Sequence, residues 1–178
     1  MWMNNAIYLV ISFLFSLLLF STAVNASVQG WGKVNMQGAI IDSACAIAVE
    51  SREQTIDMET LPLSDIIRDG QGHSKNFSIR LNNCVLERPG KKNWKHFQVT
   101  FDGEADGRLF GVMGEASGVA LQITNPNGVV AVPGEALPIG DISPGDMQLD
   151  YTMKLVANNH ALKAGDYFSL IKFRLDYF

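Results

Sequence analysis

The sequence predicts an all-β sandwich, and three observations lead to this prediction. Short segments in which apolar and polar residues alternate recur along the chain, as half-buried strands require. Gly, Pro and Asn residues separate these segments, and the 178 residues include 16 Gly and 6 Pro. Helical periodicity is nearly absent, since only residues 61–70, which end at Gly70, favour a short helix. Short strands at regular spacing are typical of a sandwich domain.

Residues 1–26 predict a secretory signal peptide that precedes this domain. Residues 6–24 carry no charge, and the small-residue site Val24-Asn25-Ala26 follows, so cleavage is expected after Ala26. The first five residues lack the usual Lys or Arg. A retained membrane anchor is the alternative, because the uncharged segment is nearly long enough to span a bilayer.

The first three predicted strands lie between residues 33 and 58. Residues 33–42 alternate through Val34 and Met36 and then continue with two isoleucines. Residues 44–49 alternate in the same way, and residues 54–58 form a third segment.

The next predicted strands have clear apolar faces. Residues 76–84 and residues 96–103 each place three large apolar side chains on one face. Residues 118–132 predict two strands around an Asn-Pro-Asn-Gly turn, and residues 149–158 alternate again.

The chain ends in an apolar strand that needs a partner. After Asp166 the segment is rich in aromatic and β-branched residues. Four alternating residues share one face of it: Ile171, Phe173, Leu175 and Tyr177. A long apolar strand at a chain terminus is an aggregation hazard unless another strand pairs with it.

The two cysteines, Cys45 and Cys84, predict a disulfide. Both lie in the part of the chain that follows the signal peptide, and a lone pair in an exported chain is most simply bonded. The closed loop would contribute roughly 4 kcal/mol of stability in the chain-entropy treatment. No CxxC and no HxxxH spacing supports a zinc site, and the sequence places no His beside either sulfur.

Composition and motifs argue against several function classes. The net charge of -4 and the lack of a long basic segment make nucleic acid an unexpected partner. The sequence contains no GxSxG, HExxH, Walker or GxGxxG motif, so it predicts no enzyme, no cofactor and no metal site.

The ordered set of segments resembles the chaperone–usher fimbrial pilins, the subunits of P-type and type 1-like bacterial pili. Gly165 is fourteenth from the end and Tyr177 is penultimate, which is similar to the C-terminal signature of that family. Residues 32–45 resemble the N-terminal segment of the family, residues 81–84 its second half-cystine site, and residues 118–123 a core strand.

Two stretches look closest to minor or anchor-type P-pilus subunits. They are residues 44–58 and residues 149–177. The segment that precedes the first strand, residues 27–37, departs from the anchoring subunit, because that subunit has a longer extension rich in aromatic residues and Pro.

The resemblance implies an incomplete immunoglobulin-like sandwich that lacks its final strand. Residues 38–178 would form this pilin domain, and a partner would complete it in trans by donor-strand complementation. The partners implied are a periplasmic chaperone, an outer-membrane usher and other pilins of the same fimbria. The C-terminal strand that chaperone and usher would recognise includes Gly165, Ile171, Phe173, Leu175 and Tyr177.

Residues 27–37 are expected to be the donor strand for a neighbouring subunit. Five positions fall on one face at period two: Val28, Gly30, Gly32, Val34 and Met36. Val34 and Met36 can fill pockets, Gly32 permits close backbone approach, and Trp31 and Lys33 point away. The alternative is a frayed tail in which the alternation is accidental.

The expected function is therefore that of a structural rod, linker or minor subunit, exported through the periplasm to a cell-surface fimbrium. A terminating or anchoring subunit at the fibre base is the alternative within the family. A fimbrial adhesin or a secreted carbohydrate-binding module is the alternative from another class. Residues 27–178 leave no room for a lectin domain ahead of a pilin domain.

Overall fold

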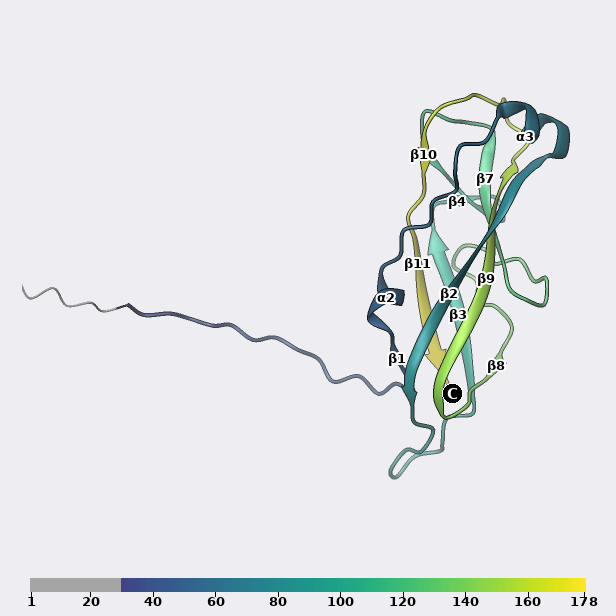
Figure 1. Ribbon diagram of the computed structural model, residues 1–178. Coiled ribbons are helices and arrows are strands. Elements are labelled where there is room, and N and C mark those ends of the chain that lie inside the picture. Colours follow the sequence, from purple (N-terminus) through teal and green to yellow (C-terminus); the bar gives the residue numbers. More distant parts are fainter. Residues whose placement is uncertain (1–29) are drawn as a thin grey trace, which may run out of the picture. The chain divides into compact units, whose positions relative to one another are not determined.

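The computed structural model describes residues 30–178, which belong to two units (Figure 1). The first unit ends at Ile40, and its described residues are exposed and form neither helix nor strand. The strand predicted over residues 33–42 is therefore wrong for this chain alone, because a strand needs a second strand to exchange backbone hydrogen bonds with. The predicted signal peptide, residues 1–26, lies outside the described residues.

The second unit, Ile41–Phe178, is built from antiparallel sheets. The largest has the strand order β1-β2-β9-β7-β5-β4, a second has the order β11-β3-β8, and β10 pairs with β6. The strands are β1 Ala46–Ile47, β2 Gln71–Cys84, β3 His96–Gly103, β4 Ala105–Asp106, β5 Leu109–Phe110, β6 Met113–Gly114, β7 Val119–Thr124, β8 Gly140–Asp141, β9 Gly145–Ala157, β10 Tyr167–Phe168 and β11 Ile171–Tyr177.

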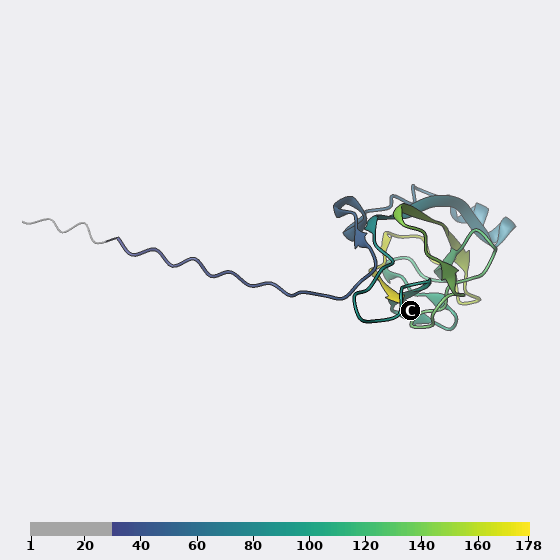
Figure 2. The ribbon, with the colours of Figure 1, turned by 90° about the horizontal axis from the view of Figure 1, so that it is seen from below.

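The two larger sheets face each other as the layers of a sandwich. Figure 2 shows β2 and β9 in the upper layer and the yellow strand β11 in the lower one. An aromatic cluster joins the layers, with the ring of Phe101 on β3 at 4.9 Å from Tyr151 and 6.1 Å from Phe77 between centroids. Phe101, Ile79 and Leu81 are among the fully buried side chains. The predicted all-β sandwich is confirmed.

The predicted helix is confirmed as α3, Leu63–Asp69. It ends at Gly70, whose φ of 69° is left-handed and whose backbone N–H donates to the carbonyl of Ile66 at 2.9 Å. A second short helix, α2, covers Val49–Arg52. Within residues 30–178, neither helix has the length and apolar character needed to cross a bilayer.

The chain leaves the edge of β2 soon after β1. Here the strand predictions for residues 44–49 and 54–58 are wrong, apart from the two residues of β1. The Ser51 hydroxyl accepts the backbone N–H of Arg80 at 3.0 Å, and the Gln54 amide donates to a carbonyl of β2 at 3.0 Å. These side chains take the place of a second backbone ladder.

The turn predicted at residues 125–128 is confirmed, but the strand predicted after it is not formed. The Asn125 side chain accepts two backbone N–H bonds within the turn, at 3.0 and 2.8 Å. Beyond the turn a single bridge links Val130 to β7. The chain then crosses to the other layer, where the backbone N–H of Leu137 donates to β3 at 2.8 Å.

Candidate functional site: an open apolar groove

The C-terminal strand has one paired edge and one open edge. β11 pairs with β3 from Ile171, opposite Gly103, to Tyr177, opposite Phe97. No residue of the described range 30–178 pairs with its other edge, because β11 stands at the end of its sheet. This open edge of β11 gives the fold an unsatisfied row of backbone donors and acceptors.

A groove runs beside the first part of this strand. It has a volume of about 1180 Å³, and residues 54–61 form one wall while residues 163–167 and 169–171 form the other. Its floor is apolar and consists mainly of Val119, Leu121, Met153 and Leu155 from β7 and β9. The groove is therefore wide enough for side chains and has an open strand edge on one side.

The wall that contains Gly165 is built by close backbone packing. A Cβ at Gly165 would lie 2.6 Å from the Cβ of Glu115 and 2.8 Å from the nitrogen of Ala116. Three backbone hydrogen bonds fix the same approach: the carbonyl of Asp166 accepts from Glu115 at 2.8 Å, and Ser117 exchanges two bonds with Lys163, at 3.1 and 3.2 Å. Gly165 thus has a physical reason to be Gly: any side chain would push this wall away from its support.

The opposite wall carries polar groups. The carboxylate of Asp57 accepts the backbone N–H of Glu59 at 2.8 Å, and Glu59 forms an ion pair with Lys75. Burial, and then the negative charge of Asp57, raise the pKa of the Tyr167 hydroxyl on the wall across from it. The groove therefore combines an apolar floor with an acidic wall.

The predicted C-terminal recognition residues share one face, as their spacing requires. Ile171 lines the groove, whereas Phe173, Leu175 and Tyr177 are half-buried and pack against the core. The structure thus joins Gly165 and Ile171 at the groove. It places the other three along the same strand, beyond the end of the groove.

Tyr177 closes the far end of β11 through a tilted aromatic contact. Its ring lies 6.0 Å from that of Trp94, and the guanidinium of Arg88 stands 3.7 Å above the Trp94 ring. The Tyr177 hydroxyl is buried and finds no hydrogen-bond partner within residues 30–178. Burial also raises the pKa of this hydroxyl. Sequence reasoning missed Trp94 and Arg88, because only the fold brings their loop to the terminal strand.

The predicted donor residues lie in the first unit. Val34 and Met36 are 85% and 91% exposed, and Trp31, on the alternate face, is 88% exposed. Gly30 and Gly32 have no atom within 4 Å of an added Cβ. Val28 lies outside the described residues. The described part of the predicted donor segment thus has large apolar side chains that are not buried within its own unit.

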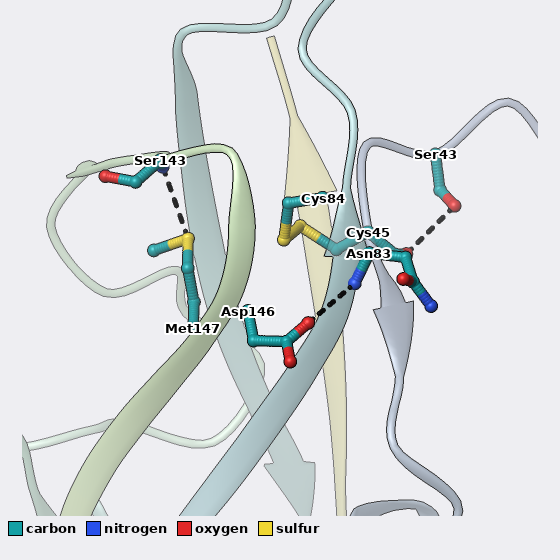
Figure 3. The surroundings of a disulfide bond; sticks show 7 residues. All are labelled: Ser43, Cys45, Asn83, Cys84, Ser143, Asp146 and Met147. Atoms are coloured by element: carbon teal, nitrogen blue, oxygen red, sulfur yellow. Dashed lines mark hydrogen bonds between the residues drawn. A yellow bond between two sulfur atoms is a disulfide. The ribbon is translucent and has the colours of Figure 1, made fainter.

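A disulfide between Cys45 and Cys84 secures the start of the domain (Figure 3). Both cysteines are buried. Around them, the hydroxyl of Ser43 donates to the carbonyl of Cys45 at 3.1 Å, and the backbone N–H of Asn83 donates to Asp146 at 3.0 Å (Figure 3). The bond ties the segment that follows the extension to the end of the long strand β2.

An ion-pair cluster lies close to this disulfide in the sequence. The carboxylate of Asp42 pairs with Arg88 and lies 2.8 Å from the ammonium of Lys91. The hydrogen bonds from Lys91 and then Arg88 lower the pKa of Asp42. Because Arg88 also stands over Trp94, the cluster joins Asp42 to the aromatic contact between Trp94 and Tyr177.

An antiparallel sandwich with an open terminal edge beside an apolar groove defines a class of protein, the immunoglobulin-like subunit that lacks one strand. No protein-family profile matches the chain. The PRS fimbrial minor pilin protein of Escherichia coli is 34% identical over 151 residues, which is 82% of this chain and 77% of that protein. Fimbria A protein of Serratia marcescens is 30% identical over 162 residues, which is 88% of this chain and 90% of that protein.

A solved structure agrees with these similarities. The P pilus rod subunit PapA superposes with a TM-score of 0.68 at 22% identity, over 76% of this chain and 99% of that one, which shows a shared fold. The chain belongs to the chaperone–usher fimbrial pilin family, and it is a structural pilus subunit. Its identity is higher with the minor pilin than with Fimbria A. These relatives are structural subunits of pili and not enzymes.

Proposed function

We propose that the groove accepts a strand from another polypeptide and that residues 27–37 supply such a strand to a second subunit. The observation that carries this proposal is the open edge of β11 beside a groove of about 1180 Å³ with an apolar floor. An added strand would satisfy the backbone groups of that edge, and its alternate side chains would fill the groove. Donor-strand complementation in trans thus accounts for the strand that the sandwich lacks.

The donor residues are assigned from their alternation. Val28, Gly30, Gly32, Val34 and Met36 form the face that enters the groove, and Trp31 and Lys33 form the outer face. Val34 and Met36 are apolar and almost fully exposed in this chain, so insertion would remove their surface from water. The domain boundaries follow, with a donor extension at 27–37 and a pilin domain at 38–178.

Before assembly a periplasmic chaperone fills the groove, and an outer-membrane usher then receives the subunit. The C-terminal strand is the recognition element, through Gly165, Ile171, Phe173, Leu175 and Tyr177. An exposed groove and a bare sheet edge would otherwise lead to aggregation. Residues 1–26 act as the signal peptide for export to the periplasm, where the Cys45–Cys84 disulfide forms in an oxidising environment.

Within the fibre, we assign this chain as a rod, linker or minor subunit. Its extension at residues 27–37 is short, and its relative in the PRS system is named a minor pilin. A terminating subunit at the fibre base is the second candidate, favoured by the similarity of residues 44–58 and 149–177 to that subunit type. The two roles differ in whether the groove exchanges its chaperone strand for the donor of a sibling subunit.

A peptide-exchange experiment tests the proposal. Purify residues 27–178 bound to the chaperone, add a peptide of residues 27–38, and follow chaperone release. A peptide with Asp at Val34 and Met36 should release little, because two charges would enter an apolar groove. The matched control carries Asp at Asn35 and Gln37 on the outer face and should release the chaperone.

The outcomes separate the alternatives. Equal activity of the inner-face and outer-face Asp peptides would contradict insertion of Val34 and Met36. If donor peptides from every sibling subunit fail to release the chaperone while the complex stays soluble, the terminating role replaces the rod or linker role.

A further inference from the structure

The outer face of the C-terminal segment carries an apolar patch at one end. Exposure alternates from Tyr167 to Leu175, with odd-numbered residues half-buried and even-numbered residues exposed. Phe168 is 61% exposed and Leu170 is 67% exposed. We call these two side chains the outer patch. The even-numbered positions that continue this face along β11 are charged instead, namely Lys172, Arg174 and Asp176.

The outer patch adjoins the groove but does not belong to its floor. Phe168 pairs with Met113 across β10 and β6, and Met113 is itself partly exposed. Leu170 stands at the rim of the groove, between Ser169 and Ile171. An inserted donor strand would cover the groove from above and would bring its own outer face level with Phe168 and Leu170.

The bulky residues of such a donor limit its register. The groove lies beside residues 163–171 and does not extend along the rest of β11, so Val34 and Met36 must both face this part of the segment. Among the antiparallel registers that meet this condition, we choose the one with Val34 opposite Tyr167, which sets the small Gly32 opposite Ser169. Both facing residues are half-buried and line the groove.

The same register fixes the outer pairs. In an antiparallel ladder the residue numbers of facing positions add up to the same value along the pair of strands. Trp31 therefore falls opposite Leu170 and diagonal to Phe168. Lys33 falls opposite Phe168, where its stem can cover the ring while its ammonium approaches the exposed Asp166. Apolar and charged positions of the two outer faces are thus matched.

We propose that Trp31 of a second copy of this chain docks on the outer patch, Phe168 and Leu170, and that this contact selects the donor that the groove accepts. The inference rests on the proposed strand insertion. Trp31 is 88% exposed and lies between two glycines. In an inserted strand its side chain would point away from the groove, so insertion itself would give this large ring no burial. Aromatic and aliphatic cross-strand pairs stabilise a sheet directly, so a donor with a small residue at this position would bind less tightly.

A double-mutant cycle tests the contact. Refold residues 27–178 with excess fluorescent peptide 27–38, and measure peptide affinity by competition with unlabelled variants. The Trp31→Ala peptide should bind about 3- to 10-fold more weakly than the wild type, from the usual strength of such pairs. On a Leu170→Thr acceptor the same peptide change should cost measurably less, because the residue directly opposite Trp31 is gone and only the diagonal contact with Phe168 remains.

A matched control and a second readout keep the result decisive. Lys172→Thr alters the same outer face outside the patch and should leave the penalty of Trp31→Ala unchanged. If the Leu170→Thr acceptor fails to refold, a peptide with 5-fluorotryptophan at position 31 reports the contact instead. Its fluorine resonance should shift on binding and lose accessibility to a soluble paramagnetic probe.

Each outcome bears on one of the two ideas. Equal affinity of the wild-type and Trp31→Ala peptides, or an equal penalty on the wild-type and Leu170→Thr acceptors, overturns the docking of Trp31 alone. An unchanged, fully accessible fluorine signal in the bound state does the same. Equal binding of a Val34→Asp peptide, or no binding by any peptide, overturns the strand insertion on which this inference rests.

Discussion

Replacing Tyr177 by Phe should stabilise the donor-bound subunit. The Tyr177 hydroxyl is buried and has no hydrogen-bond partner in residues 30–178, so the folded state carries its desolvation cost without compensation. An unsatisfied buried polar group costs about 1–3 kcal/mol. Because this side chain is only half-buried, we take the lower end, a gain of about 1 kcal/mol in the free energy of unfolding.

Replacing Tyr177 by Ser should have the opposite effect. This change removes a ring that packs at 6.0 Å from Trp94. Truncation of a fully buried aromatic residue costs about 3–5 kcal/mol, so a half-buried ring should cost about 2 kcal/mol. The two variants should therefore differ by about 3 kcal/mol in the free energy of unfolding, the sum of the hydroxyl and ring contributions.

Guanidinium unfolding of residues 27–178 with saturating donor peptide measures both changes. Lys172→Ser, an exposed change on the same strand, serves as the control and should shift the transition little. Capture by the chaperone should survive Tyr177→Phe and fail with Tyr177→Ser. A loss of 1 kcal/mol or more, about the size of one hydrogen bond, in the Phe variant would refute the reasoning, because the hydroxyl must then have a partner.

Three further changes have defined outcomes. Joint replacement of Cys45 and Cys84 by Ser should lower the free energy of unfolding by about 4 kcal/mol, since the bond closes a loop with a sequence separation of 39; an unchanged transition would contradict this. Burial raises the pKa of Tyr151 to about 12, so the folded state holds this proton more tightly than the unfolded state does. Stability should therefore be full below about pH 10 and fall by at most about 1.4 kcal/mol per pH unit up to about pH 12, and Tyr151→Phe should remove that slope in alkaline unfolding curves. Deleting residues 27–37 should leave chaperone capture intact and block entry into the fibre, as judged by co-purification and by fimbrial composition; incorporation of the truncated subunit would refute its donor role.

The longer elements could be predicted from the sequence because their signals are local. β2, β3, β9 and β11 have alternating apolar faces that any pairing would preserve. α3 could be predicted to end at Gly70 because a glycine after a helical segment is a common stop signal. The structure confirms it, since Gly70 has the left-handed backbone that glycine adopts readily. The shared face of Ile171 and Phe173 followed from the same period-two rule.

The shorter elements failed because a strand depends on what lies beside it. Residues 54–58 alternate correctly but form a groove wall instead of a strand, since Gln54 meets β2 through its side chain. Residues 33–42 alternate too, and nothing in their own unit pairs with them within the described range. Periodicity reveals the ability to pair, whereas the partner is a property of the tertiary or quaternary structure.

The candidate site was predictable in its chemistry but not in its shape. The sequence indicated which face of the terminal strand is apolar and where Gly165 stands. The groove floor combines β7 and β9, which only the fold brings together, through residues such as Leu121 and Met153. Gly165 likewise packs closely against Glu115, a residue far away in the sequence, and no local sequence pattern predicts such a contact.

The Cys45–Cys84 disulfide gives the subunit a route for mechanical tension. If the extension links subunits as proposed, the force on each subunit of a fibre pulled along its length would enter through residues 27–37 and then reach Cys45. The covalent bond would carry that force past the two-residue strand β1 and into Cys84, at the end of β2. β2 pairs with β9 from Cys84 back to Gln71, so the load would be delivered to one of the most extensively paired strands of the domain. The surface ion pair between Asp42 and Lys91 precedes the disulfide along the chain, so this weak contact would be among the first on the route to carry load.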